Sequence, residues 1–362
     1  MRSFPSRPAP IDLARARRVL VVKLSSFGDV VHVTPCLRAI RRACPEAEIL
    51  VATDATWAPA LRPDPYVDGV IAADPRRQRF LPSWIDARRR LAQQPGPRFD
   101  LAVDFQGLSR SAAWIYASGA RWRTGRGRLR PGWQLTVTPD LGRHAVRVCA
   151  EIAQRMGIAV ADLEPRLFLS EAADQAIEGI LDAVGARRSG FVLANPFGRW
   201  RSKIWPEERW AALIRRLQAE VGAPVVVAGG PGEEPAAQRL LARLAPSPPP
   251  SLVGKTSLAE AVCLYRRAAL VVSGDSGPAH AAAAVGTPVV ALFGPTWPER
   301  NGPWGESHRV IQASRAASHD IYRDAAARRH IEAIDVGAVL DAVAALYDRG
   351  RADRHRSLGA AT

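Results

Sequence analysis

Short, continuous runs of apolar residues recur along the first half of the chain, and segments with helical periodicity follow them. A run that is apolar at nearly every position is typical of a strand buried on both faces of a parallel sheet. Residues 30–45 have the apolar spacing of an amphipathic helix, which Pro45 stops. The strands predicted in this half are residues 18–24, 47–54, 67–74 and 99–107.

The same alternation restarts in the second half of the chain, where helical segments lie between apolar runs. Alternating strands and helices predict parallel sheets flanked by helices, so we expect an α/β protein with two similar halves. Ser257 and Glu260 have the spacing of a helix capping box. The strands predicted in this half are residues 190–197, 223–230, 250–255, 269–275 and 287–295.

These patterns divide the chain into two domains, a basic connector within the first, and two tails. Ligands of open parallel sheets bind at the carboxyl ends of the strands, so residues just after predicted strands are candidates for chemistry. We assign an N-terminal domain to residues 17–170, a C-terminal domain to 185–345, a connector to 121–132, and flexible tails to 1–16 and 350–362.

Composition adds a strong positive charge to this picture. The 362 residues carry a formal net charge of +15, which favours anionic partners such as nucleotides, phosphorylated lipids, a membrane surface or nucleic acid. The chain has no apolar run of the roughly 20 residues that a membrane span needs, and its N-terminus lacks the apolar core of a secretory signal. Its four cysteines are scattered without metal-ligand spacing, which favours buried thiols in a reducing cytoplasm.

The first candidate site is "KLSSFGDVVH", which runs from Lys23 to His32. A short turn through Ser26 and Gly28 brings Asp29 to the start of a helix, where backbone N–H groups can hold an anion and a carboxylate can accept a proton. A simple helix cap explains the same residues, and that alternative stays open. The glycine fingerprint of dinucleotide sites and the Walker loop are both absent.

The second candidate is "PFGRWRSKIWPEERW", where Arg199, Arg201 and Lys203 precede a helix. Cationic side chains beside a helix start suit a diphosphate. A solvated basic loop is the alternative. Because Lys203 is one of only three lysines among 50 basic residues, its presence here favours a function.

The third candidate is "VVVAGGPGEEPAAQ", where Glu233 and Glu234 begin a helix. Acidic residues at that place stabilise the helix dipole, which is one explanation. The other is that one of the two carboxylates binds ribose hydroxyls, as an acid after a strand does in other nucleotide sites.

The fourth candidate is "GDSGPAH", residues 274–280. Gly277 lets the backbone approach a ligand closely, and N–H groups at Asp275 and Ser276 are exposed where the next helix begins. His280 lies one helical turn beyond Ser276. A lone histidine at a helix start is most often structural, but these neighbours favour a binding role.

Together the four segments resemble the ADP-heptose:lipopolysaccharide heptosyltransferases, glycosyltransferase family 9. The resemblance extends over roughly residues 18–345, and "DSGPAH" followed by "PVVALFGPT" is its most specific part. "FDLAVDFQGLSRSA" and "HAVRVCAEIAQRMGI" look most like the heptosyltransferase I branch. The resemblance implies a GT-B fold, in which two Rossmann-like domains hold parallel sheets facing a central cleft.

The resemblance also implies the reaction: inverting transfer of L-glycero-D-manno-heptose from ADP-heptose to Kdo of the lipopolysaccharide inner core. A family member using another acceptor or nucleotide sugar is the nearest alternative. A D-x-D triplet and zinc-ligand spacing are absent, so we expect no metal and no cofactor. A two-domain dehydrogenase would carry the glycine fingerprint, and a nucleic-acid binder would interleave basic and aromatic residues, so both are disfavoured.

The site residues follow from the same resemblance. Asp29 is expected to be the general base that deprotonates the acceptor, with Ser26 and Gly28 beside the acceptor. On the donor side, the implied contacts are Lys203 with the diphosphate, Glu233 or neighbouring Glu234 with the adenosine, Asp275 with the heptose hydroxyls, and Ser276, Gly277 and His280 with phosphate and sugar.

A basic stretch at residues 75–90 has a further implied role. In the family such a stretch faces the anionic acceptor, so Arg76, Arg77, Arg79 and Arg88 are candidates for its carboxylate and phosphates. A solvated surface helix is the alternative. Partners are then an ADP-sugar and an anionic lipid A–Kdo type acceptor, without nucleic acid. We expect a cytoplasmic protein that works at the cytoplasmic face of the inner membrane, with peripheral association as an option.

Overall fold

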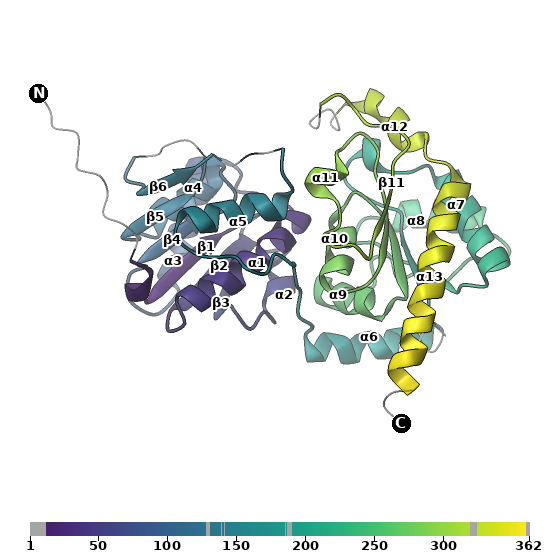
Figure 1. Cartoon of the computed structure of the whole chain (residues 1–362), viewed down its shortest axis with the longest axis horizontal. Coiled ribbons are helices and arrows are strands. Elements are labelled where there is room, and N and C mark those ends of the chain that lie inside the picture. The colour runs from purple at the N-terminus through teal and green to yellow at the C-terminus, as the bar shows by residue number, and fades with distance from the viewer. Residues whose placement is uncertain are drawn as a thin grey trace, which may run out of the picture. The chain divides into compact units, whose positions relative to one another are not determined.

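The apolar runs of the sequence form the centres of two sheets, one in each of the units into which the chain divides, Met1–Phe168 and Leu169–Thr362 (Figure 1). Every strand pair in both sheets is parallel, as the alternation of strands and helices predicts. The computed structural model describes residues 12–359 except 128–130, 139, 141, 185, 187–189 and 319–323.

The first unit holds a six-stranded sheet in the order β3-β2-β1-β4-β5-β6. Figure 1 shows α1 and α5 over one face of this sheet and α3 and α4 over the other. Its strands are β1 (Arg18–Val22), β2 (Glu48–Asp54), β3 (Gly69–Ala73), β4 (Leu101–Asp104), β5 (Trp122–Arg126) and β6 (Leu135–Val137). Its helices are η1 (Leu13–Arg15), α1 (Phe27–Ala43), α2 (Ala58–Leu61), α3 (Phe80–Ala92), α4 (Ser109–Ala117) and α5 (Ala145–Arg155).

The second unit holds a five-stranded sheet in the order β11-β10-β9-β7-β8. Its strands are β7 (Val192–Asn195), β8 (Val225–Val227), β9 (Leu270–Gly274), β10 (Val289–Leu292) and β11 (Arg309–Ile311). Its helices are α6 (Glu171–Ala183), η2 (Arg201–Lys203), α7 (Glu207–Arg216), η3 (Leu217–Val221), α8 (Glu234–Arg243), α9 (Leu258–Arg267), α10 (Gly277–Ala284), α11 (Pro298–Asn301), η5 (Ala325–Ala327), α12 (Arg328–Glu332) and α13 (Val336–Gly359).

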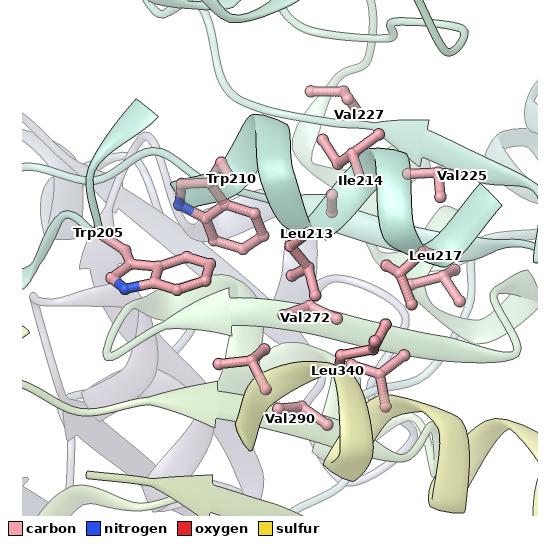
Figure 2. Close-up of a cluster of buried hydrophobic side chains, with 14 of the residues drawn as sticks. Trp205, Trp210, Leu213, Ile214, Leu217, Val225, Val227, Val272, Val290 and Leu340 are labelled. Carbon is pink, nitrogen blue, oxygen red and sulfur yellow. The ribbon is translucent and has the colours of Figure 1, made fainter. Parts of the chain in front are cut away.

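Helix α7 shows how the helical periodicity builds the core of the second unit. Figure 2 shows Trp210, Leu213 and Ile214 on one side of this helix, packed among apolar side chains of the sheet. Leu340 of α13 packs against the same cluster. All four side chains are at most 5% exposed, so apolar burial holds α7 and α13 on the sheet.

Three expectations from the sequence differ from the structure. The basic connector at 121–132 contains strand β5, which pairs with β4 despite its two arginines. Residues 250–255 form a single bridge, Val227 to Ser251, because the prolines before them lack the N–H groups that a ladder needs. Residues 13–15 of the predicted N-terminal tail form η1, and α13 extends through residues 350–359 of the predicted C-terminal tail.

The C-terminal difference has a sequence reason. Residues 350–359 contain helix-forming arginine, alanine and leucine without a proline, so nothing in them stops α13. Residues 1–11 and 360–362 of the predicted tails lie outside the described residues. In the described part of the chain, no helix combines the length and the apolarity that crossing a membrane requires.

Strand register determines which loops meet in each unit. In the first sheet Val22 lies opposite both Ala52 and Asp104, so β1, β2 and β4 end side by side. In the second sheet Ser273 pairs with Asn195, and Gly274 with Leu292, so β7, β9 and β10 end together. The residues that follow these strands therefore gather at one edge of each sheet.

Candidate active site

Asp29 lies in the first turn of α1, directly after the turn that follows β1. Its Oδ2 accepts hydrogen bonds from the backbone N–H of Ser26 at 3.1 Å and from the Ser26 hydroxyl at 2.9 Å. Its Oδ1 lies 3.5 Å from Nζ of Lys23, which is buried at the end of β1. The carboxylate is thus oriented by its own helix start, and Gly28 is buried beside it.

The charges around Asp29 keep its carboxylate ionised. Burial raises its pKa, but the positive charges of Lys23 and His32 and the two hydrogen bonds from Ser26 outweigh burial. The net effect lowers the pKa of Asp29 from 3.8 to about 2. Because the side chain is still 44% exposed, the structure presents an ionised carboxylate that a ligand can reach.

A buried ion pair contacts the turn before Asp29 through the hydroxyl of Ser25. Both guanidinium Nη atoms of Arg110 bond to the carboxylate of Asp54, at 3.2 and 3.1 Å, and Nη2 also donates to the Ser25 hydroxyl at 2.6 Å. The Ser25 backbone N–H in turn donates to Oε1 of Gln106 at 3.1 Å. Two planar, charge-assisted bonds fix Arg110 firmly, so the Ser25 turn has a rigid support.

In the second unit, Lys203 and Asp275 form a direct ion pair. Nζ of Lys203 lies 2.6 Å from Oδ2 of Asp275, and the hydroxyl of Thr296 donates to the same oxygen at 2.5 Å. The three residues follow β7, β9 and β10, whose ends lie together. The Asp275 side chain is 5% exposed and that of Lys203 is 16% exposed, so the lysine is the more exposed side chain of the pair.

Two glycines allow the turn that carries Lys203 to lie against the strand ends. A Cβ on Gly274 would lie 3.0 Å from the backbone oxygen of Lys203, and a Cβ on Gly294 would lie 2.9 Å from that of Ser202. Real Cβ atoms rarely approach a backbone oxygen so closely. Any larger residue at either position would push η2, and Lys203 with it, away from Asp275.

The pair is embedded in a short polar segment at the start of α10. Burial raises the pKa of Asp275, but the charge and hydrogen bond of Lys203, the hydroxyl of Thr296 and the charge of His280 more than compensate and lower that pKa. The Ser276 hydroxyl lies 3.1 Å from that of Ser273. Gly277 occupies the first position of the helix. Asp275, Ser276, Gly277 and His280 thus lie within one turn, as their spacing predicts.

Glu233 and Glu234 follow β8 at the same edge of this sheet. The backbone N–H of Gly230 donates to Oε2 of Glu233 at 2.7 Å, and that of Gly232 donates to Oε2 of Glu234 at 2.6 Å. Burial raises the pKa of Glu233, and Glu234 adds to the rise. Both carboxylates fold back onto the glycine loop, so their contacts in the structure are those of a helix start.

The predicted arginines at 75–90 lie on the surface of the first unit, after β3. Arg76 and Arg77 form ion pairs with Asp74, at 3.1 and 3.6 Å. Arg79 is exposed at the N-cap of α3. The Arg88 guanidinium lies over the ring of Trp84, 5.4 Å from its centroid. None of these contacts joins the arginines to the turn of Asp29.

Sequence reasoning missed three residues that the structure brings to these sites: Thr296, Arg110 and Asp54. A signal existed for Thr296 and Asp54, because each is a polar residue at or just after the end of a predicted strand. Arg110 also follows a predicted strand, residues 99–107, but its contact with Asp54 spans 56 positions and could not be read from a local pattern.

Comparisons with known proteins identify the family of this chain. The sequence profile of glycosyltransferase family 9 (heptosyltransferase) matches residues 88–329, which is two thirds of the chain. The chain belongs to glycosyltransferase family 9. This family 9 chain is therefore a glycosyltransferase. The predicted family and the predicted enzyme class are confirmed.

Individual relatives of the family 9 chain match over most of its length. It is 29% identical to lipopolysaccharide heptosyltransferase 1 of Escherichia coli K12, over 82% of this chain and 94% of the relative. It is 28% identical to lipopolysaccharide heptosyltransferase 2 of the same strain, over 88% and 94%. The structure of the E. coli ADP-heptose lipopolysaccharide heptosyltransferase II superposes with a TM-score of 0.74 at 25% identity, covering 92% of this chain and 99% of that one. The predicted GT-B fold class is confirmed by this likeness.

Proposed function

We propose that this family 9 glycosyltransferase is a heptosyltransferase of the lipopolysaccharide core. It transfers L-glycero-D-manno-heptose from ADP-heptose to Kdo, with inversion at the anomeric carbon. The observation that carries this proposal is the pairing of Lys203 with Asp275 and Thr296 at the strand ends of the second unit. The names of the relatives support the sugar and the core acceptor.

Lys203 provides the positive charge that a departing ADP requires. As the bond between heptose C1 and the phosphate oxygen breaks, the electron pair and its charge move onto the diphosphate. An ammonium has three N–H donors, and Asp275 accepts one of them at 2.6 Å. The positive charge of Lys203 stabilises the phosphates, most strongly as negative charge develops on them. This chemistry needs no metal ion.

Asp275 has two tasks in this proposal. Its Oδ2 orients both Lys203 and Thr296, while its Oδ1 is the oxygen that accepts a hydrogen bond from a heptose hydroxyl. The depressed pKa of Asp275 keeps it an acceptor at neutral pH. The N–H groups at the start of α10, with Ser276, Gly277 and His280, complete the phosphate and sugar contacts. Glu233 contacts the adenosine portion after its carboxylate leaves Gly230.

Asp29 serves as the general base on the acceptor side. The acceptor hydroxyl attacks C1 from the face opposite the leaving ADP, which inverts the configuration, and its proton passes to Asp29. A carboxylate with a pKa of about 2 is a weak base. It is nevertheless sufficient late in the reaction, because the hydroxyl becomes strongly acidic once its oxygen bonds to C1. Ser26 and Gly28 line the acceptor, and Arg76, Arg77 and Arg79 supply charge for its anionic groups.

The test measures ADP release by the purified chain from ADP-heptose, with and without Kdo-capped lipid A, beside the Asp29→Asn variant. We expect release that depends on the acceptor and that the substitution abolishes. Failure to bind any ADP-sugar would overturn the proposal.

A second candidate differs only in the acceptor. Heptosyltransferases 1 and 2 of E. coli match this chain with nearly equal identity, 29% and 28%, which supports another acceptor of the lipopolysaccharide core as the alternative. Supplying ADP-heptose with Kdo-capped lipid A in one reaction and a heptosylated core in another distinguishes them. Release with the second acceptor alone would favour the alternative.

A further inference from the structure

Four of the five large apolar side chains that are exposed in the described part of the chain belong to two neighbouring segments. Phe80, Leu81 and Ile85 lie on α3 and Leu108 lies at the N-cap of α4, with 42%, 62%, 57% and 50% of their surface exposed. The fifth, Val310, lies on β11 of the other unit and is 38% exposed. Contiguous exposed apolar surface of this kind marks an interaction site in soluble proteins.

The two segments are neighbours in the first unit because α3 packs against α4. The Ser83 hydroxyl donates to the backbone oxygen of Arg110 at 3.0 Å, and the Phe80 ring meets the Tyr116 ring edge-on at 6.2 Å. Ser83 is buried on the inner side of α3, whereas Leu81 and Ile85 lie one turn apart on the outer side. We call the surface made by Phe80, Leu81, Ile85 and Leu108 the α3 face.

Positive charge surrounds the α3 face. Residues 74–90 contain six arginines and two aspartates. Asp74 pairs with Arg76 and Arg77, and Asp86 pairs with Arg90. Two carboxylates cannot neutralise six guanidinium groups, so the rim of this apolar surface is strongly cationic.

We propose that the α3 face docks on an anionic lipid bilayer. Exposed aliphatic and aromatic side chains on a helix with arginines around them match a bilayer surface, because the apolar groups enter the boundary between acyl chains and headgroups while the arginines meet lipid phosphates. A second copy of this chain fits the surface less well. Pairing two α3 faces would bring twelve guanidinium groups of like charge together.

The α3 face lies at a position where docking on a bilayer would serve the proposed reaction. The turn before α3 follows β3, and Leu108 follows β4, so the face begins at the strand-end edge that also carries Asp29. A bilayer bound there brings lipid-linked molecules to the edge where Asp29 is exposed. This use rests on the proposed function, but the docking itself does not.

The test is co-sedimentation of the full chain with vesicles of pure phosphatidylcholine or of phosphatidylcholine mixed with phosphatidylglycerol, without donor or acceptor. We expect binding to the mixed vesicles that added salt weakens, and little binding to phosphatidylcholine alone. The double variant Leu81→Glu/Ile85→Glu should bind the mixed vesicles at least about tenfold more weakly, because two apolar anchors are lost and two negative charges are added.

Val310→Glu is the matched control, since it places the same charge on an exposed apolar position outside the α3 face. Its vesicle binding should equal that of the unchanged chain. Because all three side chains are exposed, each variant should also keep the thermal unfolding midpoint. Equal vesicle binding by the double variant and the unchanged chain would overturn the proposal. So would a dimer that the double variant dissociates in the absence of vesicle binding.

Activity separates this proposal from the proposed transferase function. The double variant should release ADP normally when the acceptor is a water-soluble Kdo compound. Vesicle binding without any transferase activity would support the docking surface and overturn the transferase proposal. Transferase activity without vesicle binding would support the transferase proposal and overturn the docking surface.

Discussion

Each unit carries a lysine–aspartate pair at the carboxyl edge of its sheet, but the two pairs are exposed in opposite ways. In the first unit the Asp29 side chain is 44% exposed and Lys23 is 3% exposed. In the second unit Asp275 is 5% exposed and Lys203 is 16% exposed. In the first unit the aspartate is thus the more exposed partner, while in the second unit the lysine is.

Residue type and topological position alone therefore do not determine the chemistry of these two pairs. Both aspartates follow a buried parallel strand, both start a helix, and a histidine lowers the pKa of each. What differs is which partner is covered. The buried Lys23 lowers the pKa of Asp29 and cannot itself bind a diphosphate. The buried Asp275 instead holds Lys203 in place to bind a diphosphate.

The largest expected effect comes from replacing the exposed carboxylate. Asp29→Asn should lower kcat by about 10²–10⁴-fold, because an amide cannot accept the acceptor proton. The donor KM should stay nearly the same. Asp275→Asn is the matched comparison and should raise the donor KM, since it disturbs Lys203. Steady-state ADP release measures kcat and the donor KM of both variants. An equal loss of kcat in the two variants would contradict the different roles of Asp29 and Asp275.

The next effect comes from removing the exposed ammonium. Lys203→Met should raise the donor KM and also lower kcat, so that kcat/KM falls at least roughly tenfold to a hundredfold, which corresponds to the loss of a charged hydrogen bond worth about 1.5–3 kcal/mol. Lys255→Met is the matched control, because Lys255 is an exposed lysine of the same unit. Kinetics at varied ADP-heptose concentration measure the effect, and an unchanged KM in Lys203→Met would contradict it.

A smaller effect concerns the buried lysine. Lys23 lowers the pKa of Asp29, whereas burial raises it, so Lys23→Met should raise that pKa from about 2. A raised pKa moves protonation of the base to higher pH, so the acid limb of the kcat/KM profile should shift upward. Carbon-13 titration of the Asp29 carboxyl, beside the kinetic profile, measures the shift. A titration identical to that of the unchanged chain would refute this role of Lys23.

The smallest effect is expected from metal removal. Because Lys203 supplies the charge that the leaving diphosphate requires, EDTA should leave the rate of ADP release unchanged. Assays with EDTA and with added Mg²⁺ give the answer. A rate lost in EDTA and restored by Mg²⁺ would show that the ammonium is not the cation of the second unit.

Much of the fold could be predicted from the sequence, because central parallel strands are apolar on both faces. Residues 18–24 and 269–275 contain β1 and β9 almost entirely. Strand β5 could not be found in this way, since its sequence, "WRTGR", is basic and contains glycine. Its pairing with β4 depends on the sheet and not on its own apolar content.

Some residues of the candidate site could be singled out from the sequence, but the contacts between them could not. Asp29, Lys203 and Asp275 follow strands, which singled them out. Contact between Lys203 and Asp275 spans 72 positions and arises because β7 lies beside β9 in the sheet. The opposite exposure of the two pairs depends on packing around each side chain, which no local pattern records.

The most direct test of these roles is a calorimetric titration with ADP of the unchanged chain, Asp29→Asn and Lys203→Met. We expect Lys203→Met to lose ADP affinity and Asp29→Asn to keep it, because the first unit supplies the base and the second supplies the cation. Loss of ADP affinity in Asp29→Asn, with Lys203→Met unaffected, would contradict the division of roles between the two pairs.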